Sequence, residues 1–311
     1  MKKKLAAAFA LFAFTAPVLN ATGPGPRPPV LQPPDRLIFG SDDRADRYQV
    51  RDARLLAAAD AIFTFIPKEG LERLPGGGFA FSKKRTHQEY LNLCPGEKFA
   101  SQPAPGTFCT GFLAKPDVAV TAGHCVEDDE LQNFCDKYYL VFDYSMQGQD
   151  SARTTFNDSQ VYACSSVLAR RFENTAAADY AILRLSRPVM DRAPLRIRTS
   201  GKVASNARLA TIGHPKGLPQ KFVGKASVLD NSPALFFGSD IDAFHGNSGG
   251  PVINMDTMEV EGLVIRVSGY YQADGDYVAD PVRQCNRLFV TTGQRTSLLI
   301  ERPAVFSDLL P

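Results

Sequence analysis

The hexapeptide Gly246-Asn247-Ser248-Gly249-Gly250-Pro251 contains three glycines, and the rest of the sequence can be interpreted around it. A serine hydroxyl is a weak nucleophile at its ordinary pKa, so it needs a neighbouring base and donors for the oxyanion of the transition state. Glycines beside Ser248 let the backbone turn sharply and let a substrate carbonyl approach the amides of Gly246 and Ser248. The hexapeptide therefore predicts a nucleophilic serine whose oxyanion hole is made by these two amides.

Residues 246–250 also satisfy the G-x-S-x-G pattern of the nucleophile elbow in α/β-hydrolases. In that fold the histidine of the triad follows the serine in the chain. The histidines of this chain are His87, His124, His214 and His245, and none of them follows Ser248. Chain order therefore excludes the elbow and leaves the order His, Asp, Ser.

The expected general base is His124, in the segment Thr121-Ala122-Gly123-His124-Cys125. A buried carboxylate usually orients such an imidazole and stabilises its protonated form. Asp179 opens the apolar run DYAILRL, which is typical of a strand entering a core, where an unpaired carboxylate would be costly. Asp179 is therefore the expected partner of His124, with a cap role as its alternative and Asp143 as a rival near another apolar run.

The three motifs TAGHC, DYAILRL and GNSGGPV, in this order, resemble those of the chymotrypsin-like (trypsin-type) serine peptidases, over roughly residues 39–292. The resemblance implies an all-β fold, namely a double antiparallel β-barrel with the active site between the barrels. It implies His124 as general base, Asp179 as the orienting carboxylate and Ser248 as nucleophile. No metal ion and no organic cofactor are expected.

Short runs of β-branched and aromatic residues recur between turn-rich segments, with little helical pattern. This pattern independently predicts a β-sandwich or barrel. Within a serine peptidase domain at 39–311, we expect barrel one at about 55–187 and barrel two at about 188–300. Catalysis would require the barrels to dock, because the expected base and nucleophile lie in different ones.

Residues 1–21 have the pattern of a secretory signal peptide, with three lysines, an apolar run over Leu5–Phe14 and then small residues. The apolar run is too short for a membrane span, and no later segment is long enough. We expect a secreted or periplasmic protein. Residues 22–38, rich in Pro and Gly, predict an extended linker or a propeptide.

The formal net charge of +2 belongs largely to the three lysines at 2–4, without which it becomes −1. Nothing in this balance indicates a nucleic-acid partner. The expected partner is a protein or peptide substrate, and the expected state is a monomer.

The chain has six cysteines, which are Cys94, Cys109, Cys125, Cys135, Cys164 and Cys285. An even count in an exported chain favours disulfides over metal or redox roles, although sequence alone leaves fifteen connectivities. The segments FCTGF and TAGHC resemble two paired strands that family members link beside the histidine, which implies a disulfide between Cys109 and Cys125. The others are expected to pair as Cys135 with Cys164 and Cys94 with Cys285.

Two charged residues are candidates for substrate binding. Asp242 lies six residues before Ser248, the offset at which trypsin-type enzymes hold a carboxylate for a basic side chain, and its alternative role is that of a turn residue. Arg266 falls in the strand expected to edge the pocket, where the trypsin-type pattern has small and aromatic residues. If Arg266 points into the pocket, it would favour a substrate with an acidic side chain, as in the glutamyl endopeptidases. Residues 37–44 also resemble the entry segment of those enzymes. If Arg266 points out, it would be a solvated strand residue.

Asn247 departs from the family pattern. Animal digestive members carry an aspartate there, which pairs with a newly cut N-terminal amine and orders the oxyanion hole. Neutral Asn247 cannot form that ion pair, so activation by this route is not expected. His245 immediately precedes Gly246 and could border the cleft, but a lone neighbouring histidine is more often incidental.

The resulting hypothesis is an exported serine endopeptidase that acts through an acyl-enzyme intermediate. One alternative is a catalytically inert protease-fold module that serves binding or adhesion. Another is an esterase on the same scaffold. An activated serine separates the first alternative from an enzyme, and the ratio of ester to peptide turnover separates the second.

Overall fold

The computed structural model describes residues 38, 41–127, 131, 133–173, 178–267, 276–288 and 297–311. The expected signal peptide at 1–21, and the expected linker at 22–38 apart from Ile38, lie outside the described residues. Among the helices of the described ranges, none has the length and apolar character needed to cross a membrane.

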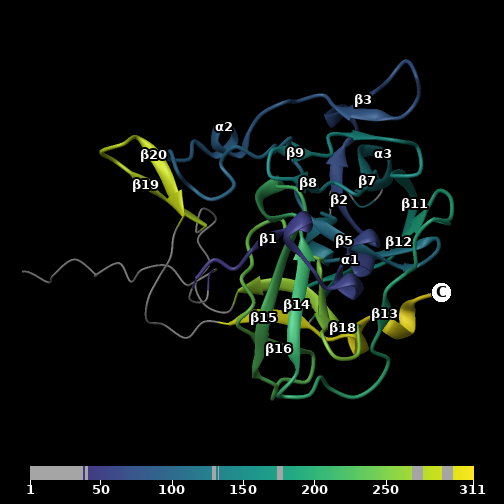
Figure 1. The fold of residues 1–311 in the computed structure, drawn as a ribbon. Coiled ribbons are helices and arrows are strands. Elements are labelled where there is room, and N and C mark those ends of the chain that lie inside the picture. The colour runs from purple at the N-terminus through teal and green to yellow at the C-terminus, as the bar shows by residue number, and fades with distance from the viewer. Residues whose placement is uncertain are drawn as a thin grey trace, which may run out of the picture. The chain divides into compact units, whose positions relative to one another are not determined.

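Six antiparallel strands close the first barrel in the order β11-β12-β6-β5-β2-β7 (Figure 1). Their bounds are Ile62–Pro67 (β2), Thr110–Lys115 (β5), Val118–Thr121 (β6), Tyr138–Phe142 (β7), Val161–Phe172 (β11) and Asp179–Leu185 (β12). Aromatic side chains fill its interior, where the ring of Phe63 meets the rings of Phe65 and Phe142 edge to face. The β-branched and aromatic runs of the sequence therefore form this barrel because their inward side chains share one apolar core.

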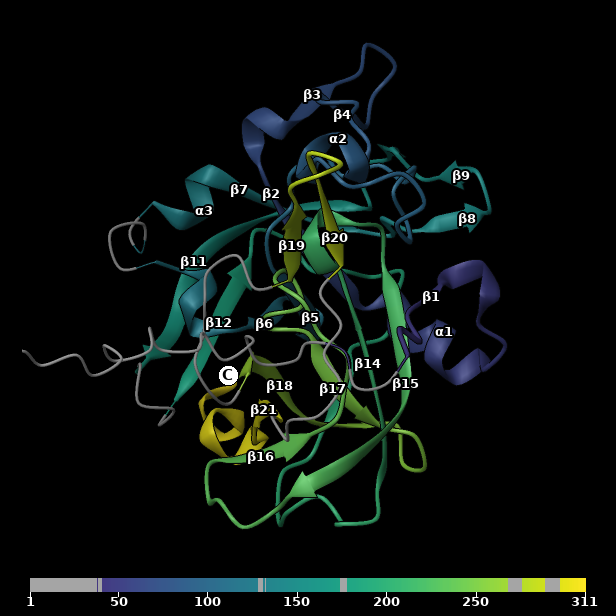
Figure 2. The same ribbon diagram turned by 90° about the vertical axis from the view of Figure 1, so that its left-hand side faces the viewer.

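Six further strands close the second barrel in the order β15-β14-β17-β18-β21-β16, because β15 pairs with both β14 and β16 (Figure 2). Their bounds are Arg208–Gly213 (β14), Lys221–Asp230 (β15), Phe236–Ser239 (β16), Pro251–Asn254 (β17), Glu259–Val267 (β18) and Leu298–Glu301 (β21). Two short strands extend this sheet, β1 (Ala45–Asp46) beside β15 and β13 (Arg196–Ile197) beside β18. The predicted double antiparallel β-barrel is confirmed.

The described helices are few and short. They are α1 (Ala53–Asp60), α2 (His87–Leu91) and α3 (Phe134–Lys137), with 3-10 turns at Arg47–Gln49, Lys68–Gly70, Gly123–Cys125, Pro215–Gly217, Pro303–Val305 and Ser307–Leu309. The remaining strands are β3 (Leu71–Arg73), β4 (Phe79–Phe81), β8 (Met146–Gly148), β9 (Ser151–Ala152), β10 (Thr155–Phe156), β19 (Tyr277–Asp280) and β20 (Cys285–Leu288). Helix α2 begins with a capping box, in which Thr86 and Glu89 bind each other's backbone N–H groups.

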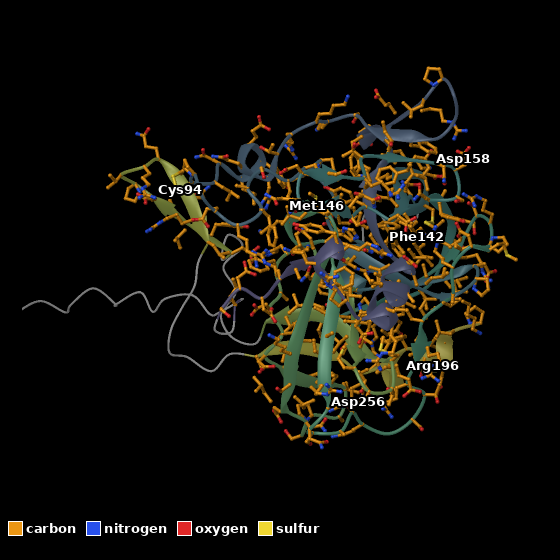
Figure 3. All side chains as sticks on the ribbon, viewed as in Figure 1. Cys94, Phe142, Met146, Asp158, Arg196 and Asp256 are labelled. Carbon is orange, nitrogen blue, oxygen red and sulfur yellow. A yellow bond between two sulfur atoms is a disulfide. The ribbon has the colours of Figure 1, made fainter. Side chains whose placement is uncertain are left out.

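Three disulfides join Cys94 to Cys285, Cys109 to Cys125 and Cys135 to Cys164. These are the three pairs named from the sequence. The first links the segment after α2 to the β19–β20 hairpin, beside which Cys94 is labelled in Figure 3. The second links Cys109, just before β5, to the turn after β6 and so braces the residue next to His124.

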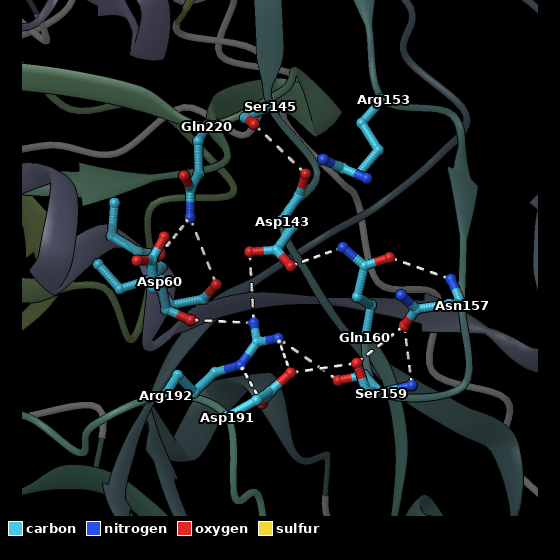
Figure 4. A network of polar contacts seen from close by, with 12 residues as sticks. Asp60, Asp143, Ser145, Arg153, Asn157, Ser159, Gln160, Asp191, Arg192 and Gln220 are labelled. Atoms are coloured by element: carbon cyan, nitrogen blue, oxygen red, sulfur yellow. Dashed lines mark hydrogen bonds and ion pairs between the residues drawn. The ribbon is translucent and has the colours of Figure 1, made fainter.

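Gln220, in the turn before β15, fastens the second barrel to the first. Its side-chain Nε2 donates a 2.8 Å hydrogen bond to the carbonyl of Ala59 (Figure 4). Its backbone N–H donates one of 2.8 Å to the carbonyl of Tyr144. Gln220 is fully buried, so these bonds are made in a low-dielectric setting. They fix the relative placement of the barrels, which the site needs.

Asp143 is engaged in the same region and not by the histidine. Its carboxylate accepts a 2.6 Å hydrogen bond from Gln160 Nε2 and lies 3.3 Å from a guanidinium nitrogen of Arg192, whose side chain is only 5% exposed (Figure 4). Arg192 also donates to the carbonyl of Asp60 at 3.1 Å. The contacts of Asp143 among the described residues are therefore with Gln160 and Arg192 and not with His124.

The segment at 42–46 belongs to the second barrel. Strand β1 pairs with β15, and the carboxylate of Asp46 lies 2.6 Å from Lys221 Nζ, which also donates to Gln102 at 2.6 Å. Burial lowers the pKa of Lys221 to about 8, against the opposing charge of Asp46. The ion pair is buried, so removing one partner alone would be strongly destabilising.

Candidate active site

His124 and Asp179 meet because their strands pair. Strand β12 runs antiparallel to β6, with Ala181 opposite Thr121, so the start of β12 lies beside the end of β6. The Asp179 carboxylate then spans His124, with Oδ2 2.9 Å from the ring Nδ1 and Oδ1 accepting the backbone N–H at 2.9 Å. The carboxylate fixes both the ring and the main chain of the histidine.

Asp179 is held in its charged form although it is only 1% exposed. Burial would raise the pKa of Asp179, but the hydrogen bonds and charge of His124 and the charge of Arg266 together hold this pKa below its ordinary value. The charged carboxylate can therefore stabilise a protonated imidazole on His124.

Gly123 lets the turn before His124 pack closely on the neighbouring strands. A Cβ at this position would lie 2.0 Å from the carbonyl oxygen of Arg171 and 2.9 Å from that of Tyr180. No side chain fits there without moving β11 or β12. The glycine of the TAGHC motif is thus required by the close approach that brings His124 to Asp179.

Ser248 lies against the end of β6, next to the turn that carries His124. Its carbonyl accepts the N–H of Thr110 at 2.9 Å, and Gly249 has a φ of +79°. A Cβ on Gly249 would lie 2.2 Å from Thr121 Oγ1 and 2.6 Å from Ala122 N, so only glycine allows this approach. The structure therefore brings the expected nucleophile from barrel two to the histidine of barrel one.

The His124 ring bonds to Asp179 through Nδ1, and its bonds to the described residues do not include one to the Ser248 hydroxyl. Hydrogen bonds between a nucleophile and its base are often long before substrate binds and tighten in the reacting complex.

The backbone around Gly246 leaves two N–H groups available. Gly246 has a φ of +98°, and its carbonyl accepts a 2.6 Å hydrogen bond from Thr110 Oγ1. Within the described part of the chain, the N–H groups of Gly246 and Ser248 donate to no protein acceptor. Unpaired N–H groups are rare in folded chains, so this pair is suited to bind an oxyanion.

Asp242 is 3% exposed, and the carboxyl group of Asp43 lies close enough to interact with it. Burial raises the pKa of Asp43, and the interaction with Asp242 offsets part of this rise. Asp242 is therefore a buried carboxyl group with a second one beside it. The sequence alone did not indicate that Asp43 approaches it.

The guanidinium of Arg266 lies beside the carboxylate of Asp179. Its guanidinium Nη2 lies 3.2 Å from Asp179 Oδ2 and donates to the carbonyl of Glu173 at 3.2 Å. The side chain is 21% exposed, so this ion pair is partly screened. These contacts direct its charge toward the carboxylate that holds His124.

Glu301 is a site residue that the sequence analysis missed. It ends β21, is 1% exposed, and its Oε2 accepts the backbone N–H of Asp179 at 2.5 Å. Burial raises the pKa of Glu301 to about 8, in part offset by the Asp179 N–H and further favoured by the negative charge of Asp179. Its position after the apolar run Leu298–Ile300 resembles that of Asp179 before its own run, which is the signal that could have found it.

The raised pKa of Glu301 predicts a pH dependence of stability. Its ordinary value is 4.5 and its folded value about 8, so its contribution to the free energy of unfolding is complete below 4.5 and is lost as pH rises through about 8. The Glu301→Gln variant keeps an oxygen for the Asp179 N–H but has no proton to lose. Urea unfolding at about pH 4 and about pH 9 should show the wild type losing stability relative to the variant at the higher pH. A difference that does not change with pH would contradict the raised pKa.

Cys109, Cys125 and His124 are close enough to suggest a metal site, since one donor atom of each lies within 4.8 Å of the others. The two sulfur atoms are joined in a disulfide, however, and metals bind the thiolate form of cysteine. This set does not fit a metal ion.

Comparison with known proteins identifies one family. The family model described as trypsin-like peptidase domain matches residues 109–263, a range that contains His124, Asp179 and Ser248. A search of curated protein sequences finds no match.

Solved structures with a similar fold include a Glu endopeptidase in complex with MPD, at 14% identity and a TM-score of 0.49 over 88% of this chain and 96% of that one. Another is the inactive serine-to-alanine mutant of Rv3671c from M. tuberculosis H37Rv, at 12% identity and a TM-score of 0.45 over 88% and 93%. The match to the family model and the two closed six-stranded barrels lead to one conclusion: the chain belongs to the chymotrypsin-like, trypsin-type serine peptidases, which are endopeptidase hydrolases.

Proposed function

We propose that the protein is an exported serine endopeptidase that cleaves protein or peptide substrates through an acyl-enzyme. The observation that carries the proposal is the Asp179 carboxylate, which binds both the ring and the backbone N–H of His124 at 2.9 Å while Ser248 packs beside them. Three disulfides support export, because such bonds persist in oxidising compartments.

In the proposed mechanism, His124 Nδ1–H donates to Asp179, so the neutral ring carries its lone pair on Nε2. Nε2 accepts the proton of the Ser248 hydroxyl as Oγ attacks the substrate carbonyl. The amides of Gly246 and Ser248 bind the resulting oxyanion, and His124 then protonates the leaving amine. Water reverses these proton transfers when it hydrolyses the acyl-enzyme.

Two charged residues predict opposite preferences for the side chain before the cleaved bond. Asp242 would select Arg or Lys, and Arg266 would select Glu or Asp. Each is engaged by another group, Asp242 by Asp43 and Arg266 by Asp179. Cleavage-site profiling of a proteome-derived peptide library, run beside Ser248→Ala, assigns the pocket to one of them.

Among the described residues, the His124 ring has no hydrogen bond to the Ser248 hydroxyl, and an inert protease-fold module would show the same. A fluorophosphonate probe decides between the two functions, because it labels only an activated serine. We expect labelling of the wild type and none of Ser248→Ala. Equal labelling of both proteins, or none of either, would contradict the proposal. Comparison of ester with peptide turnover tests the esterase alternative.

A further inference from the structure

The peptide bond between His245 and Gly246 is held from one side by the backbone of Lys216. The Lys216 N–H donates a 2.6 Å hydrogen bond to the carbonyl of His245. A trans peptide is planar and points its C=O and N–H in opposite directions, so this bond turns the Gly246 N–H away from Lys216. That N–H is one of the two proposed oxyanion donors.

The turn that presents Lys216 is itself unusual. Lys216 has a φ of +51°, in the left-handed region that residues other than glycine rarely adopt. Such conformations persist where surrounding contacts hold them, and they gather at functional sites. Here the conformation allows both the N–H and the side chain of Lys216 to serve the segment before Gly246.

Asp276 holds His245 from its other end. Its Oδ2 lies 2.7 Å from His245 Nδ1, 3.4 Å from His245 N and 2.6 Å from Lys216 Nζ. Asp276 is 1% exposed, and hydrogen bonds to a charged group in such a setting are strong. His245 is thus bound at its ring, its N–H and its carbonyl by two residues that also bind each other.

The β19–β20 hairpin delivers Asp276, which directly precedes β19. The hairpin is fixed by the disulfide between Cys94 and Cys285 and by a 2.8 Å hydrogen bond from Cys94 N to the carbonyl of Asn286. The disulfide and this hydrogen bond therefore hold the hairpin that places Asp276 beside His245.

Arg44 lies close to residues that neighbour His245 and Asp276 in the chain. Its guanidinium lies 3.9 Å from the centre of the Phe244 ring. Burial raises the pKa of Tyr277, and the nearby charge of Arg44 opposes this rise. Phe244 precedes His245 and Tyr277 follows Asp276, so Arg44 holds the two segments together. The docked segment at 42–46 thereby supports the same loop.

The negative charge of Asp276 explains why Lys216 is needed beside it. A lone carboxylate near Gly246 would oppose the negative charge that develops on the oxyanion. Lys216 Nζ at 2.6 Å neutralises Asp276, so the pair can hold the loop without repelling the transition state.

We propose that Asp276 and Lys216 are positioning residues of the oxyanion hole, which fix the His245–Gly246 peptide so that the Gly246 N–H faces the substrate. They would supply the order that the ion pair at the Asn247 position supplies in animal digestive members. The proposal rests on the proposed peptidase function.

The test compares Asp276→Asn with Asp280→Asn, the same chemical change at the other end of β19. Asp280 binds the N–H groups of Val282 and Arg283 and has no contact with His245 in the described residues. For Asp276→Asn we expect kcat for a peptide substrate to fall about 10- to 100-fold with KM within about twofold of wild type. Affinity for a peptide boronate should fall with kcat, and Asp280→Asn should match wild type.

Thermal unfolding shows whether each variant is folded. If Asp276→Asn does not fold, His245→Gln carries the test, because the His245 side chain is 33% exposed and its loss spares the core. A folded Asp276→Asn or His245→Gln variant with wild-type kcat and boronate affinity would overturn the proposed positioning role. If the wild-type protein neither reacts with the fluorophosphonate nor cleaves peptide substrates, the proposed peptidase function is overturned, and the positioning role rests on that function.

Discussion

Replacing His124 by alanine should lower kcat/KM for a peptide substrate by about 10⁶-fold while the protein stays folded. The His124 side chain is 30% exposed, and its ring bonds to Asp179 among the described residues, so its removal disturbs little packing. Without the imidazole, the Ser248 hydroxyl has no base to accept its proton. Steady-state kinetics and thermal unfolding of the purified proteins measure the two effects separately.

The double variant His124→Ala with Ser248→Ala provides a sharper form of this prediction. Members of a triad act as one unit, so the double variant should be no less active than either single one. Ser165→Ala, at an exposed position on β11, is the matched serine control and should retain wild-type activity. Activity of His124→Ala within tenfold of wild type would remove this residue from the mechanism.

Replacing Asp179 by asparagine should lower kcat by about 10⁴-fold. Asp179 Oδ2 accepts the hydrogen on His124 Nδ1 at 2.9 Å, whereas an amide nitrogen in that place would donate to Nδ1. The ring would then carry its hydrogen on Nε2 and could not accept the Ser248 proton. Kinetics at neutral pH with the folded variant measure the loss.

Asp143→Asn is the matched control for this change. Asp143 binds Gln160 and Arg192, so the variant should lose stability in urea unfolding while its folded fraction keeps the wild-type kcat. A fall in kcat confined to Asp143→Asn, with Asp179→Asn active, would reverse the assignment of the catalytic carboxylate.

The parts of the fold that could be predicted from the sequence are those that depend on short motifs. The residues around His124, Asp179 and Ser248 carry constraints that act over a few positions, such as the glycines at 123 and 249 that permit close backbone approach. The alternating apolar runs likewise encode strands locally. The strand pattern predicted a β-sandwich or barrel, and the resemblance of the three motifs to a known family implied the double barrel.

The supporting residues could not be found in this way, because they come from distant parts of the chain. Glu301 is 122 positions from Asp179 and Arg266 is 87 positions from it, each on the other barrel. Strand alternation says only whether a side chain points into or out of its own barrel. It does not say which group of the second barrel lies opposite once the two dock, and here that opposite group is Asp179.

Asp276 illustrates the same limit at shorter range. It lies 31 positions from His245, and it directly precedes the hairpin that is held by Cys285. From sequence, His245 therefore looked incidental beside Gly246. Its role emerges only when Lys216 and Asp276 are seen on either side of it.

Strand β21 also bears on when a newly made chain can become active. The ribosome adds His124, Asp179 and Ser248 before it reaches Leu298–Glu301. Until β21 joins β16 and β18, barrel two is open and Asp179 lacks the contact with Glu301. Under the proposed mechanism, an unfinished chain holds the three side chains without a closed second barrel, so we expect activity only after β21 has joined its neighbours.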